Sequence, residues 1–452
     1  MHHPSSYRDP SGYMFEKDGV LYRQVNLSFR DSFDHFISSG CYDHFVGKGL
    51  LIPHETIPGL LTGDARGYAT LKPQLIPFIT YPWEWTFGML KDAALLTLQL
   101  AREALHYEMM LKDATPYNVQ WYRGRLIFID TLSFERYSET PWIAYRQFCE
   151  QFLGPLLLMH YQKLPLQPLQ LSWPDGIPLA VISRLLPKRT KFSLHTYLHI
   201  HLHARVSGRK GKKQATPHFS KQKLLTLLSS LESLVNKLRL DPQKSTWSEY
   251  YEEASGRANY LEDKKAIIAG WLDKIPGLKT GADLGANEGA FARLLSKREI
   301  ETLAVDFDPF CIDALYKAIK KDNEKKLQPG ILDLSNPSPA IGVNNEERMP
   351  FLQRVNVDIV LALALVHHLA IGKNIPFEKI ADLFHRLGRI LVIEFVPKTD
   401  EKVQLMLETK PDIYTDYTED NFVSSFSTYF SIAERQEVED TGRVLFLMKT
   451  KS

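Results

Sequence analysis

Strand-like and helix-like segments alternate from about residue 246 to the end of the chain, and this pattern limits the fold more than any other feature. Five predicted strands lie near 280–284, 301–306, 329–333, 357–363 and 389–395. Strands separated by helices are typical of a parallel α/β sheet. The final runs "FSIAERQEV" and "VLFLMKT", joined by the turn "EDTGR", predict an antiparallel hairpin. We therefore expect a mostly parallel sheet that ends in a hairpin.

The first predicted strand leads into "KTGADLGANEGAFARLL", which contains Asp283, Gly285 and Gly289 in the pattern D-x-G-x-x-x-G. Glycines in such a loop allow the backbone to approach a ligand closely, beside the positive end of the helix that follows. A dinucleotide site would require G-x-G-x-x-G, but Asn287 and Ala290 break that spacing. The loop thus predicts a ligand site and disfavours NAD.

Acidic residues stand at the ends of the next two predicted strands. Asp306 in "LAVDFDPF" follows Asp283 by 23 positions, and Asp333 lies in "ILDLSNP". Ligands of open α/β sheets bind at the carboxyl ends of the strands. There Asp306 can accept hydrogen bonds from two ribose hydroxyls, Phe307 can lie on an adenine face, and Asp333 can meet an adenine amino group.

In this order the motifs resemble those of the class I S-adenosylmethionine-dependent methyltransferases, over about 246–452. The resemblance implies a Rossmann-like seven-stranded sheet with an antiparallel C-terminal hairpin, and S-adenosyl-L-methionine as cofactor. It implies that the methionine part is lined by Gly285, Ala286, Asn287 and Gly289, the ribose is held by Asp306, and the adenine lies near Phe307 and Asp333. A capping role for Asp283 is compatible with a place in the same site, and Tyr260 is the candidate for a lid over the cofactor.

The whole chain resembles a bacterial two-part family related to nodulation-associated methyltransferases. The phrases "LKDATPYNVQ", "FIDTLSFE", "DLSNPSPAIG", "LALALVHHLAIG" and "VIEFVPKTD" carry this resemblance. It implies cofactor use and leaves the methyl acceptor open: a small molecule, a sugar, a peptide or RNA.

Candidate catalytic residues follow the fourth and fifth predicted strands. Methyl transfer is an in-line displacement, so the enzyme must position the acceptor and remove any proton it carries. His367 and His368 are candidates for the general base, because histidine titrates near neutral pH. Glu394 is a candidate for orienting the acceptor or a histidine. In the alternative interpretation, one histidine caps a helix and the other packs in the core.

The N-terminal half contains a second motif, "KDATPYN" followed by "FID". Asp113, Asn118 and Asp130 have the spacing of the catalytic base and two magnesium ligands of protein kinases. A predicted helix at 91–110 precedes them, and the strand pair "VQWY" and "RLIFI" separates them. Residues 90–160 thus resemble the C-lobe of kinase-like and aminoglycoside-type phosphotransferases.

Three departures from that pattern indicate a degenerate kinase-like domain. "LK" replaces the His or Arg before Asp113, "DTL" replaces DFG, and residues 1–70 lack G-x-G-x-x-G. Lys72 is the candidate phosphate-contacting lysine, although a proline follows it. We expect the domain to present the methyl acceptor. The alternative is a magnesium- and ATP-dependent phosphotransferase, or a nucleotide-binding scaffold, that uses the three residues of the motif.

A basic stretch lies between the two halves. Residues 205–223 carry seven Lys or Arg and no acid, and leucines at helical spacing follow at 224–240. We therefore predict a kinase-like domain at 1–204, a connector with a helix at 205–245 and a methyltransferase domain at 246–452. A further alternative uses the connector to bind RNA, as an adaptor or an RNA methyltransferase, because a local cluster of cations suits an anionic partner.

Weaker signals concern metals and location. In "LHTYLHIHLHAR", a strand would place His199, His201 and His203 on one face, as a zinc site needs, but no Cys or carboxylate joins them. We predict no metal there and expect a solvated or phosphate-facing strand. Three distant cysteines, no signal peptide and no apolar run of bilayer length predict a cytoplasmic protein without a membrane partner. The oligomeric state stays open.

Overall fold

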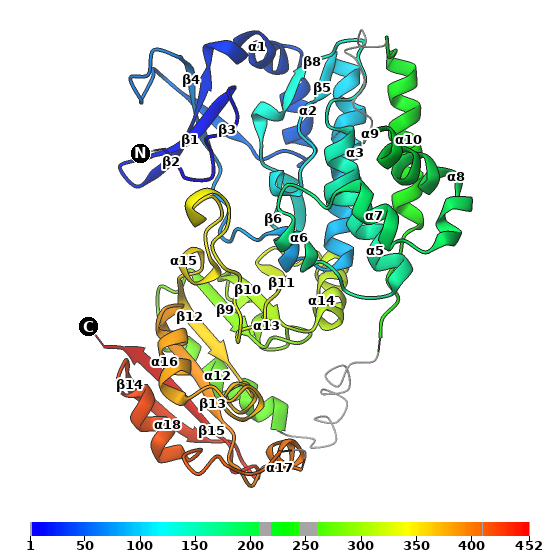
Figure 1. Ribbon diagram of the computed structural model, residues 1–452. Helices are drawn as coiled ribbons and strands as arrows, with labels where there is room; N and C mark the ends of the chain where they lie inside the picture. The colour runs from blue at the N-terminus through cyan, green and yellow to red at the C-terminus, as the bar shows by residue number, and fades with distance from the viewer. Residues whose placement is uncertain (1, 208–217, 244–259, 409, 452) are drawn as a thin grey trace. The chain divides into compact units, whose positions relative to one another are not determined.

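A computed structural model describes residues 2–207, 218–243, 260–408 and 410–451 (Figure 1). By its internal contacts the chain divides into two compact units. The first comprises Met1–Asp241 and Ile341–Arg348, and the second comprises Pro242–Ala340 and Met349–Ser452. Within the described residues, every helix is too short or too polar to cross a lipid bilayer.

The second unit is built on a seven-stranded mixed sheet with the order β11-β10-β9-β12-β13-β15-β14. The strands are β9 (Thr280–Leu284), β10 (Glu301–Asp306), β11 (Leu327–Ile331), β12 (Val357–Ala362), β13 (Gly388–Phe395), β14 (Phe430–Glu437) and β15 (Val444–Thr450). The first five are parallel, and β15 runs antiparallel to both β13 and β14. The mixed α/β sheet and its C-terminal hairpin are as predicted.

Strand order reverses between β9 and β12, and open α/β sheets place their ligand crevice at such a point. Four of the five predicted parallel strands match within one residue at each end. The third ends at Ile331 instead of 333, so Asp333 lies in the following loop. "QPG" inside this strand is a poor strand sequence, which explains the misplaced boundary.

Helices pack on this sheet and bury its apolar side chains. They are α12 (Tyr260–Asp273), α13 (Ala292–Ser296), α14 (Pro309–Asp322), α15 (Phe351–Arg354), α16 (Phe377–His385), α17 (Glu401–Leu407) and α18 (Glu419–Phe426). One core cluster joins Ile268 and Trp271 of α12 to Leu361, Val392 and Leu447 of the sheet. These residues are almost fully buried, so the cluster holds the strands that form the site.

The first unit combines a four-stranded antiparallel sheet, two further antiparallel strand pairs and many helices. The sheet has the order β1-β2-β4-β3, and β5 pairs with β8 and β6 with β7. Its strands are β1 (Gly12–Lys17), β2 (Val20–Asn26), β3 (His54–Ile57), β4 (Gly67–Pro73), β5 (Met109–Leu111), β6 (Val119–Tyr122), β7 (Arg125–Phe128) and β8 (Phe134–Arg136). Its helices are α1 (Arg30–Ser38), α2 (Cys41–Gly47), α3 (Phe87–Ala104), α4 (Tyr145–Phe148), α5 (Gly154–Gln162), α6 (Leu169–Ser172), α7 (Leu179–Leu185), α8 (Leu194–Thr196), α9 (His203–Ser207) and α10 (Lys221–Lys237).

The helix predicted at 91–110 is α3, which begins and ends earlier. Thr86 caps its N-terminus by accepting a hydrogen bond from the Met89 N–H, and Glu108 at φ +53° separates it from β5. α10 begins at Lys221, three residues before the prediction, and packs on α3 through the Arg102–Glu232 ion pair. The basic stretch at 208–217 and the expected start of the methyltransferase domain at 246–259 lie outside the described residues.

The strand predicted around His199, His201 and His203 is wrong. The chain is helical there, through α8, a π-helical turn at Tyr197–Leu202 and α9. The alternation in "LHIHLH" fits a strand, but Leu194, Leu198 and Leu202 also repeat every four residues. The helical spacing prevails: Thr196, His199 and Ile200 then share a face that is buried in the unit, while these leucines lie on the exposed face.

Candidate functional site

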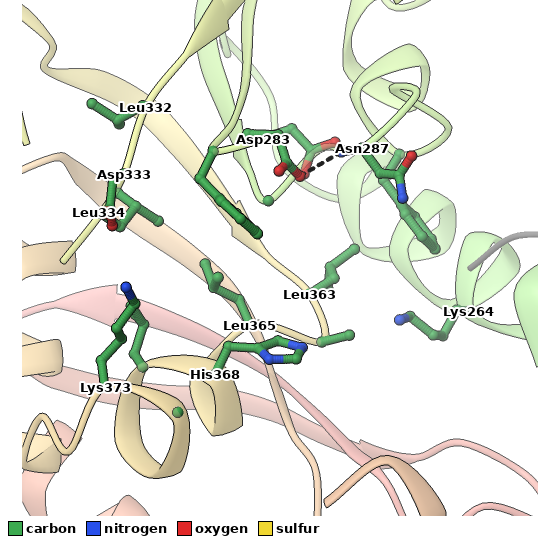
Figure 2. A pocket seen from close by; sticks show the side chains of 17 residues that line it. Lys264, Asp283, Asn287, Leu332, Asp333, Leu334, Leu363, Leu365, His368 and Lys373 are labelled. Atoms are coloured by element: carbon green, nitrogen blue, oxygen red, sulfur yellow. Dashed lines mark hydrogen bonds between the residues drawn. The ribbon is translucent and has the colours of Figure 1, made fainter. Parts of the chain in front are cut away.

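A cavity of about 240 Å³ lies at the carboxyl edge of the parallel strands. Figure 2 shows Asp283 and Asn287 on one wall and His368 on the other. We call it the strand-edge cavity. The residues that line it are Lys264, Asp283, Gly285, Asn287, Phe291, Asp306, Phe307, Leu332, Asp333, Leu334, Leu363, Ala364, Leu365, His368, Leu369, Gly372 and Lys373. The crevice predicted from the sequence therefore exists, and it gathers residues from β9, β10 and the segments that follow β11 and β12.

The glycine-containing loop after β9 adopts the positive-φ conformations that its glycines allow. Gly285 and Gly289 have φ values of +80° and +77°, and a Cβ at Gly289 would lie 2.8 Å from Leu315. The N–H groups of Gly285 and Ala286 both donate to the Val305 carbonyl, at 2.9 and 3.0 Å. Because these donors are already used, side chains are better placed than the loop backbone to recognise a ligand.

Asp306 organises the loop from the end of β10. One carboxylate oxygen accepts the Asn287 N–H at 2.9 Å and the other accepts the Asp308 N–H at 2.9 Å. Burial raises the pKa of Asp306, and these backbone donors partly oppose that rise. The Phe307 N–H also donates to this carboxylate, so of its about four acceptor positions at least one remains for a ligand.

Two further predicted residues face the cavity from neighbouring loops. The Phe307 side chain remains 54% exposed although it lines the cavity, which leaves a ring face accessible. Asp333 is exposed and accepts hydrogen bonds from the Ser335 N–H and hydroxyl, at 2.9 and 2.6 Å. This short turn holds the Asp333 carboxylate at the cavity, in the loop that follows β11.

Asp283 has a buried carboxylate oxygen that the ordered structure does not satisfy. Among the described residues, its Oδ2 has no hydrogen-bond partner. Burial, with a smaller contribution from nearby Asp306, raises the pKa of Asp283 to about 7, although the Ala292 N–H and Lys264 oppose the rise. An unpaired polar oxygen in a cavity wall indicates a missing donor.

The two candidate histidines occupy different environments. His368 lines the cavity, and burial with nearby Arg443 lowers its pKa to about 4. His367 is 2% exposed and lies outside the cavity wall. Burial lowers its pKa well below the usual value, and its Nδ1 has no partner among the described residues. The arrangement favours His368 over His367 for contact with a substrate.

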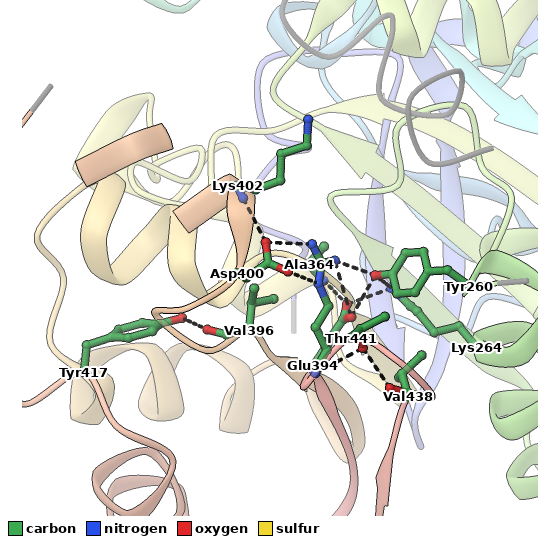
Figure 3. Close-up of polar contacts among 11 residues, drawn as sticks. Tyr260, Lys264, Ala364, Glu394, Val396, Asp400, Lys402, Tyr417, Val438 and Thr441 are labelled. Carbon is green, nitrogen blue, oxygen red and sulfur yellow. Dashed lines mark hydrogen bonds and ion pairs between the residues drawn. The ribbon is translucent and has the colours of Figure 1, made fainter. Parts of the chain in front are cut away.

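Glu394 belongs to a buried polar network behind the cavity (Figure 3). Its carboxylate accepts hydrogen bonds from Lys264 Nζ at 2.7 Å, the Tyr260 hydroxyl at 2.9 Å and the Ala364 N–H at 2.6 Å. Burial alone would raise the pKa of Glu394, but Lys264 and Arg443 bring it below its usual value. With both oxygens engaged, Glu394 positions other groups and does not face the cavity.

Arg443 extends the network to the start of α17. Its guanidinium pairs with Asp400 through two hydrogen bonds, at 2.8 and 3.1 Å, and also donates to the Tyr260 hydroxyl.

Tyr260 is 5% exposed and lies outside the cavity wall, so its predicted place as a lid differs from the buried contact observed. Ala286 and Gly289 also lie outside the cavity wall.

Sequence reasoning did not identify Lys264, Arg443 or Asp400. One signal was available, because Lys264 follows Tyr260 by one helical turn in α12. The network has a structural consequence at Ala364, whose φ of +50° is rare for a residue with a Cβ. Glu394 accepts the Ala364 N–H and so stabilises this conformation in the loop that leads to His368.

Comparison with known proteins gives one full-length relative. No family model matches the chain. The nodulation protein NoeA of Rhizobium meliloti (strain 1021) is 33% identical over 453 residues, which cover 98% of this chain and 94% of that protein. The chain belongs to the NoeA family.

Two solved structures resemble this NoeA-family chain at low overall scores. Magnesium protoporphyrin IX methyltransferase from Synechocystis PCC 6803, with bound SAH, is 15% identical over 47% of this chain and 90% of that chain, with a TM-score of 0.30. The bifunctional kinase-methyltransferase WbdD is 11% identical over 43% of this chain and 39% of that chain, with a TM-score of 0.28. Scores of this size carry no functional argument, so the fold rests on strand order and register.

The motif predicted in the N-terminal unit of this NoeA-family chain forms a closed hydrogen-bond network. Asp113 accepts from Gln147 Nε2 at 2.6 Å and from Asn118 Nδ2 at 3.2 Å. Asn118 also donates to Ser133 Oγ at 3.1 Å, and that hydroxyl donates to Asp130 at 2.6 Å. The fold thus brings the three predicted residues together.

A cation already pairs with the last carboxylate of this motif. Arg23 of β2 lies 2.6 Å from Asp130, and both side chains are mostly buried. Arg23 lies opposite Leu71 in the sheet, so Lys72 projects from the other sheet face, where it is exposed. Lys72 is therefore not oriented toward the carboxylates with Arg23, contrary to the role expected for it.

No metal centre is evident in the described part of the chain, where no group of three His, Cys, Asp or Glu side chains could hold an ion. His199 contacts the Tyr145 hydroxyl, and His201 contacts Ser183 and Thr190 instead. The helix thus turns His201 away from the other two, while His199 and His203 both contact the Tyr145 ring.

Proposed function

We propose that this NoeA-family chain is an S-adenosylmethionine-dependent methyltransferase whose cofactor site is the strand-edge cavity. One observation carries the proposal: Asp283, Asp306 and Asp333, from three neighbouring strand ends, line one cavity together with the accessible ring of Phe307. Such a set suits a ligand that combines an adenosine with a cationic amino-acid group.

The chemistry of the residues that line the cavity supports this cofactor. Asp306 keeps an acceptor position for a ribose hydroxyl, and Phe307 offers a ring face to the adenine. The unpaired Oδ2 of Asp283 matches an ammonium donor. Asn287 and Gly285 complete the wall beside it.

When bound, S-adenosylmethionine supplies a methyl group on a sulfonium, which is open to in-line displacement. Leu363, Leu365 and Leu369 exclude water from the wall after β12. His368 lies in the same wall, where its neutral imidazole can accept a proton from the acceptor, but the lowered pKa of about 4 makes it a weak base. Glu394 contributes by holding the Ala364 loop that leads to His368.

For the N-terminal unit we propose a kinase-like domain that does not transfer phosphate and instead helps to bind the methyl acceptor. The Arg23–Asp130 ion pair supports this proposal, because a guanidinium meets the carboxylate that would hold magnesium in an active kinase. The contact therefore disfavours the alternative of a magnesium-dependent phosphotransferase.

Isothermal titration of the full chain with S-adenosylmethionine and with S-adenosylhomocysteine tests the cofactor assignment. We expect both to bind, and ATP and NAD to bind at least tenfold more weakly. Asp306→Asn should weaken binding of both ligands by about tenfold or more, since charged hydrogen bonds contribute roughly 1.5–3 kcal/mol. Asp322→Asn, at an exposed position in the same unit, is the matched control and should leave affinity unchanged. Equal affinity of the two variants would remove Asp306 from the site.

A further inference from the structure

An exposed apolar stripe runs along the helical segment from α8 to α9 in the first unit. Leu194, Leu198, Leu202 and Val206 recur every four residues and are 67%, 43%, 36% and 59% exposed. We call these four residues the leucine stripe. Phe192, just before α8, is 92% exposed. Large apolar side chains gathered on one exposed helix face indicate an interaction site, whereas scattered ones do not.

The opposite face of this segment is firmly attached to the unit. His199 hydrogen-bonds to the Tyr145 hydroxyl at 2.8 Å and to Ser230 Oγ at 2.9 Å. His201 hydrogen-bonds to Ser183 and Thr190, each at 2.8 Å. The segment therefore presents polar histidines inward and leucines outward, which is the reverse of an ordinary surface helix. The stripe is a fixed feature of the unit's surface.

The surroundings of the stripe are basic. The sequence contains no Asp or Glu between Asp175 and Glu232. In this stretch Arg184, Lys188, Arg189, Lys191 and Arg205 are exposed, and they flank the stripe in the chain. Burial lowers the pKa of His201, and Lys191 and Arg205 lower it further, so both cations lie near His201; Arg205 belongs to α9 itself. No carboxylate among the described residues pairs with Lys191 or Arg205.

This combination selects among the possible occupants. A second copy of the chain would bring like charges together around the two stripes, which is unfavourable. RNA would satisfy the cations, but its phosphates and bases give four exposed aliphatic side chains no apolar partner. An anionic lipid surface satisfies both, because cations contact the headgroups while apolar side chains enter the acyl boundary.

We propose that the leucine stripe and its flanking cations dock this protein on the surface of an anionic lipid bilayer. The segment Leu194–Ser207 is roughly 20 Å long, enough to lie in the interface plane but not to span it. Absence of a spanning helix in the described residues agrees with surface binding. The expectation of no membrane partner considered only segments that could span a bilayer. Because a strand was predicted around His199, the leucines were not expected to share one exposed helix face.

Sedimentation of the full chain with vesicles tests the proposal. One vesicle set is pure phosphatidylcholine and the other contains about one third phosphatidylglycerol, a composition that adds negative surface charge. The stripe variant is Leu198→Ser with Leu202→Ser. The matched control is Leu60→Ser with Leu75→Ser, two leucines of the same unit that are 42% and 57% exposed. Melting temperatures of both variants are compared with the parent to confirm folding.

We expect the parent to bind the anionic vesicles, and to bind neutral ones at least tenfold more weakly. The stripe variant should lose about tenfold or more in affinity, because membrane binding scales with buried apolar area. The control variant should bind as the parent does. The proposal is overturned if the parent ignores anionic vesicles or if the stripe and control variants bind equally. Preferential binding of a labelled single-stranded RNA, with vesicles unable to compete, would also overturn it.

Discussion

Lys264 Nζ lies 2.7 Å from Glu394 Oε2, and their side chains are 1% and 0% exposed. Arg443 and Asp400 form a second, equally buried pair in contact with the first, so the charges balance. Burying charge is costly unless each group is paired and hydrogen-bonded, and here the partners are present. The network joins α12 and β13 to the loop after β12 and to the residues just before β15 and α17, and it meets the strand-edge cavity at Lys264 and Ala364.

Removing one partner of this pair should destabilise the protein strongly. Lys264→Met leaves the Glu394 carboxylate buried without its principal cation, which costs about 3–5 kcal/mol. The exposed pair Lys265–Glu262 on the same helix provides the control, and Lys265→Met should cost about 0–1 kcal/mol. Urea denaturation of the three proteins measures the difference.

Glu394→Gln separates packing from charge in the same network. The amide keeps the shape and can accept the Ala364 N–H, but it leaves Lys264 without a carboxylate. We expect a loss of stability comparable to that of Lys264→Met. If Lys264→Met and Lys265→Met were equally mild, the buried pair would have no role in holding the cavity wall.

Phe307 should contribute to cofactor affinity through its exposed ring. Stacking of a base on an aromatic side chain contributes about 1–3 kcal/mol, so Phe307→Ala should weaken S-adenosylhomocysteine binding by roughly tenfold or more. Phe307→Trp should preserve binding and report it by a change in fluorescence. Ile413→Ala, at a site 71% exposed in the same unit, is the control. Unchanged affinity in Phe307→Ala would exclude stacking.

Asp283 should make the stability of the protein depend on pH. Its pKa is raised from the ordinary 3.8 to about 7, chiefly by burial. The native state therefore holds a proton that the unfolded state has lost, and this contribution disappears as pH rises through 7. Between pH 5 and pH 8 the free energy of unfolding should fall by roughly 2–3 kcal/mol from this group alone.

Asp283→Asn removes that titration and is close to isosteric. Urea denaturation at pH 5 and pH 8 gives the free energy of unfolding of both proteins. The value for the variant minus that for the parent should rise by the same roughly 2–3 kcal/mol from pH 5 to pH 8. The other titrating groups, including His368, are present in both proteins, so their contributions to the pH dependence cancel in the difference. A constant difference across this range would mean that Asp283 is ionised in the native state throughout.

The Arg23–Asp130 ion pair predicts that magnesium and ATP do not stabilise the parent protein. A ligand that binds only the native state raises the melting temperature, so magnesium with ATP should leave it unchanged. Arg23→Met removes the cation from Asp130, and its change in melting temperature with magnesium and ATP is compared with that of the parent. A rise in the parent that EDTA abolishes, and that Asp130→Asn lacks, would instead support a magnesium-nucleotide site.

Features set by chain periodicity could be predicted from the sequence. Asp283, Asp306 and Asp333 meet in one cavity because the carboxyl ends of parallel strands share one sheet edge. The positive φ at Gly285 likewise follows from local sequence, since glycine adopts it without steric cost.

Contacts between distant parts of the chain could not be predicted. Lys264 and Glu394 are 130 residues apart, and no local spacing indicates their pairing. Without that contact, Glu394 at a strand end suggested a group that faces the substrate. For the helix around His199, alternation and four-residue repeats competed in one short stretch, and only packing on Tyr145 and Ser230 decides between them.

Hydrogen exchange of the full chain, with and without saturating S-adenosylhomocysteine, tests the central claim most directly. The account predicts slower exchange in the loop 285–289, at 306–309 and at 363–373, which surround the strand-edge cavity. It predicts no slowing at 113–130 in the N-terminal unit. Unchanged exchange throughout, or protection confined to the N-terminal unit, would contradict the assignment of the cavity as the methyl-donor site.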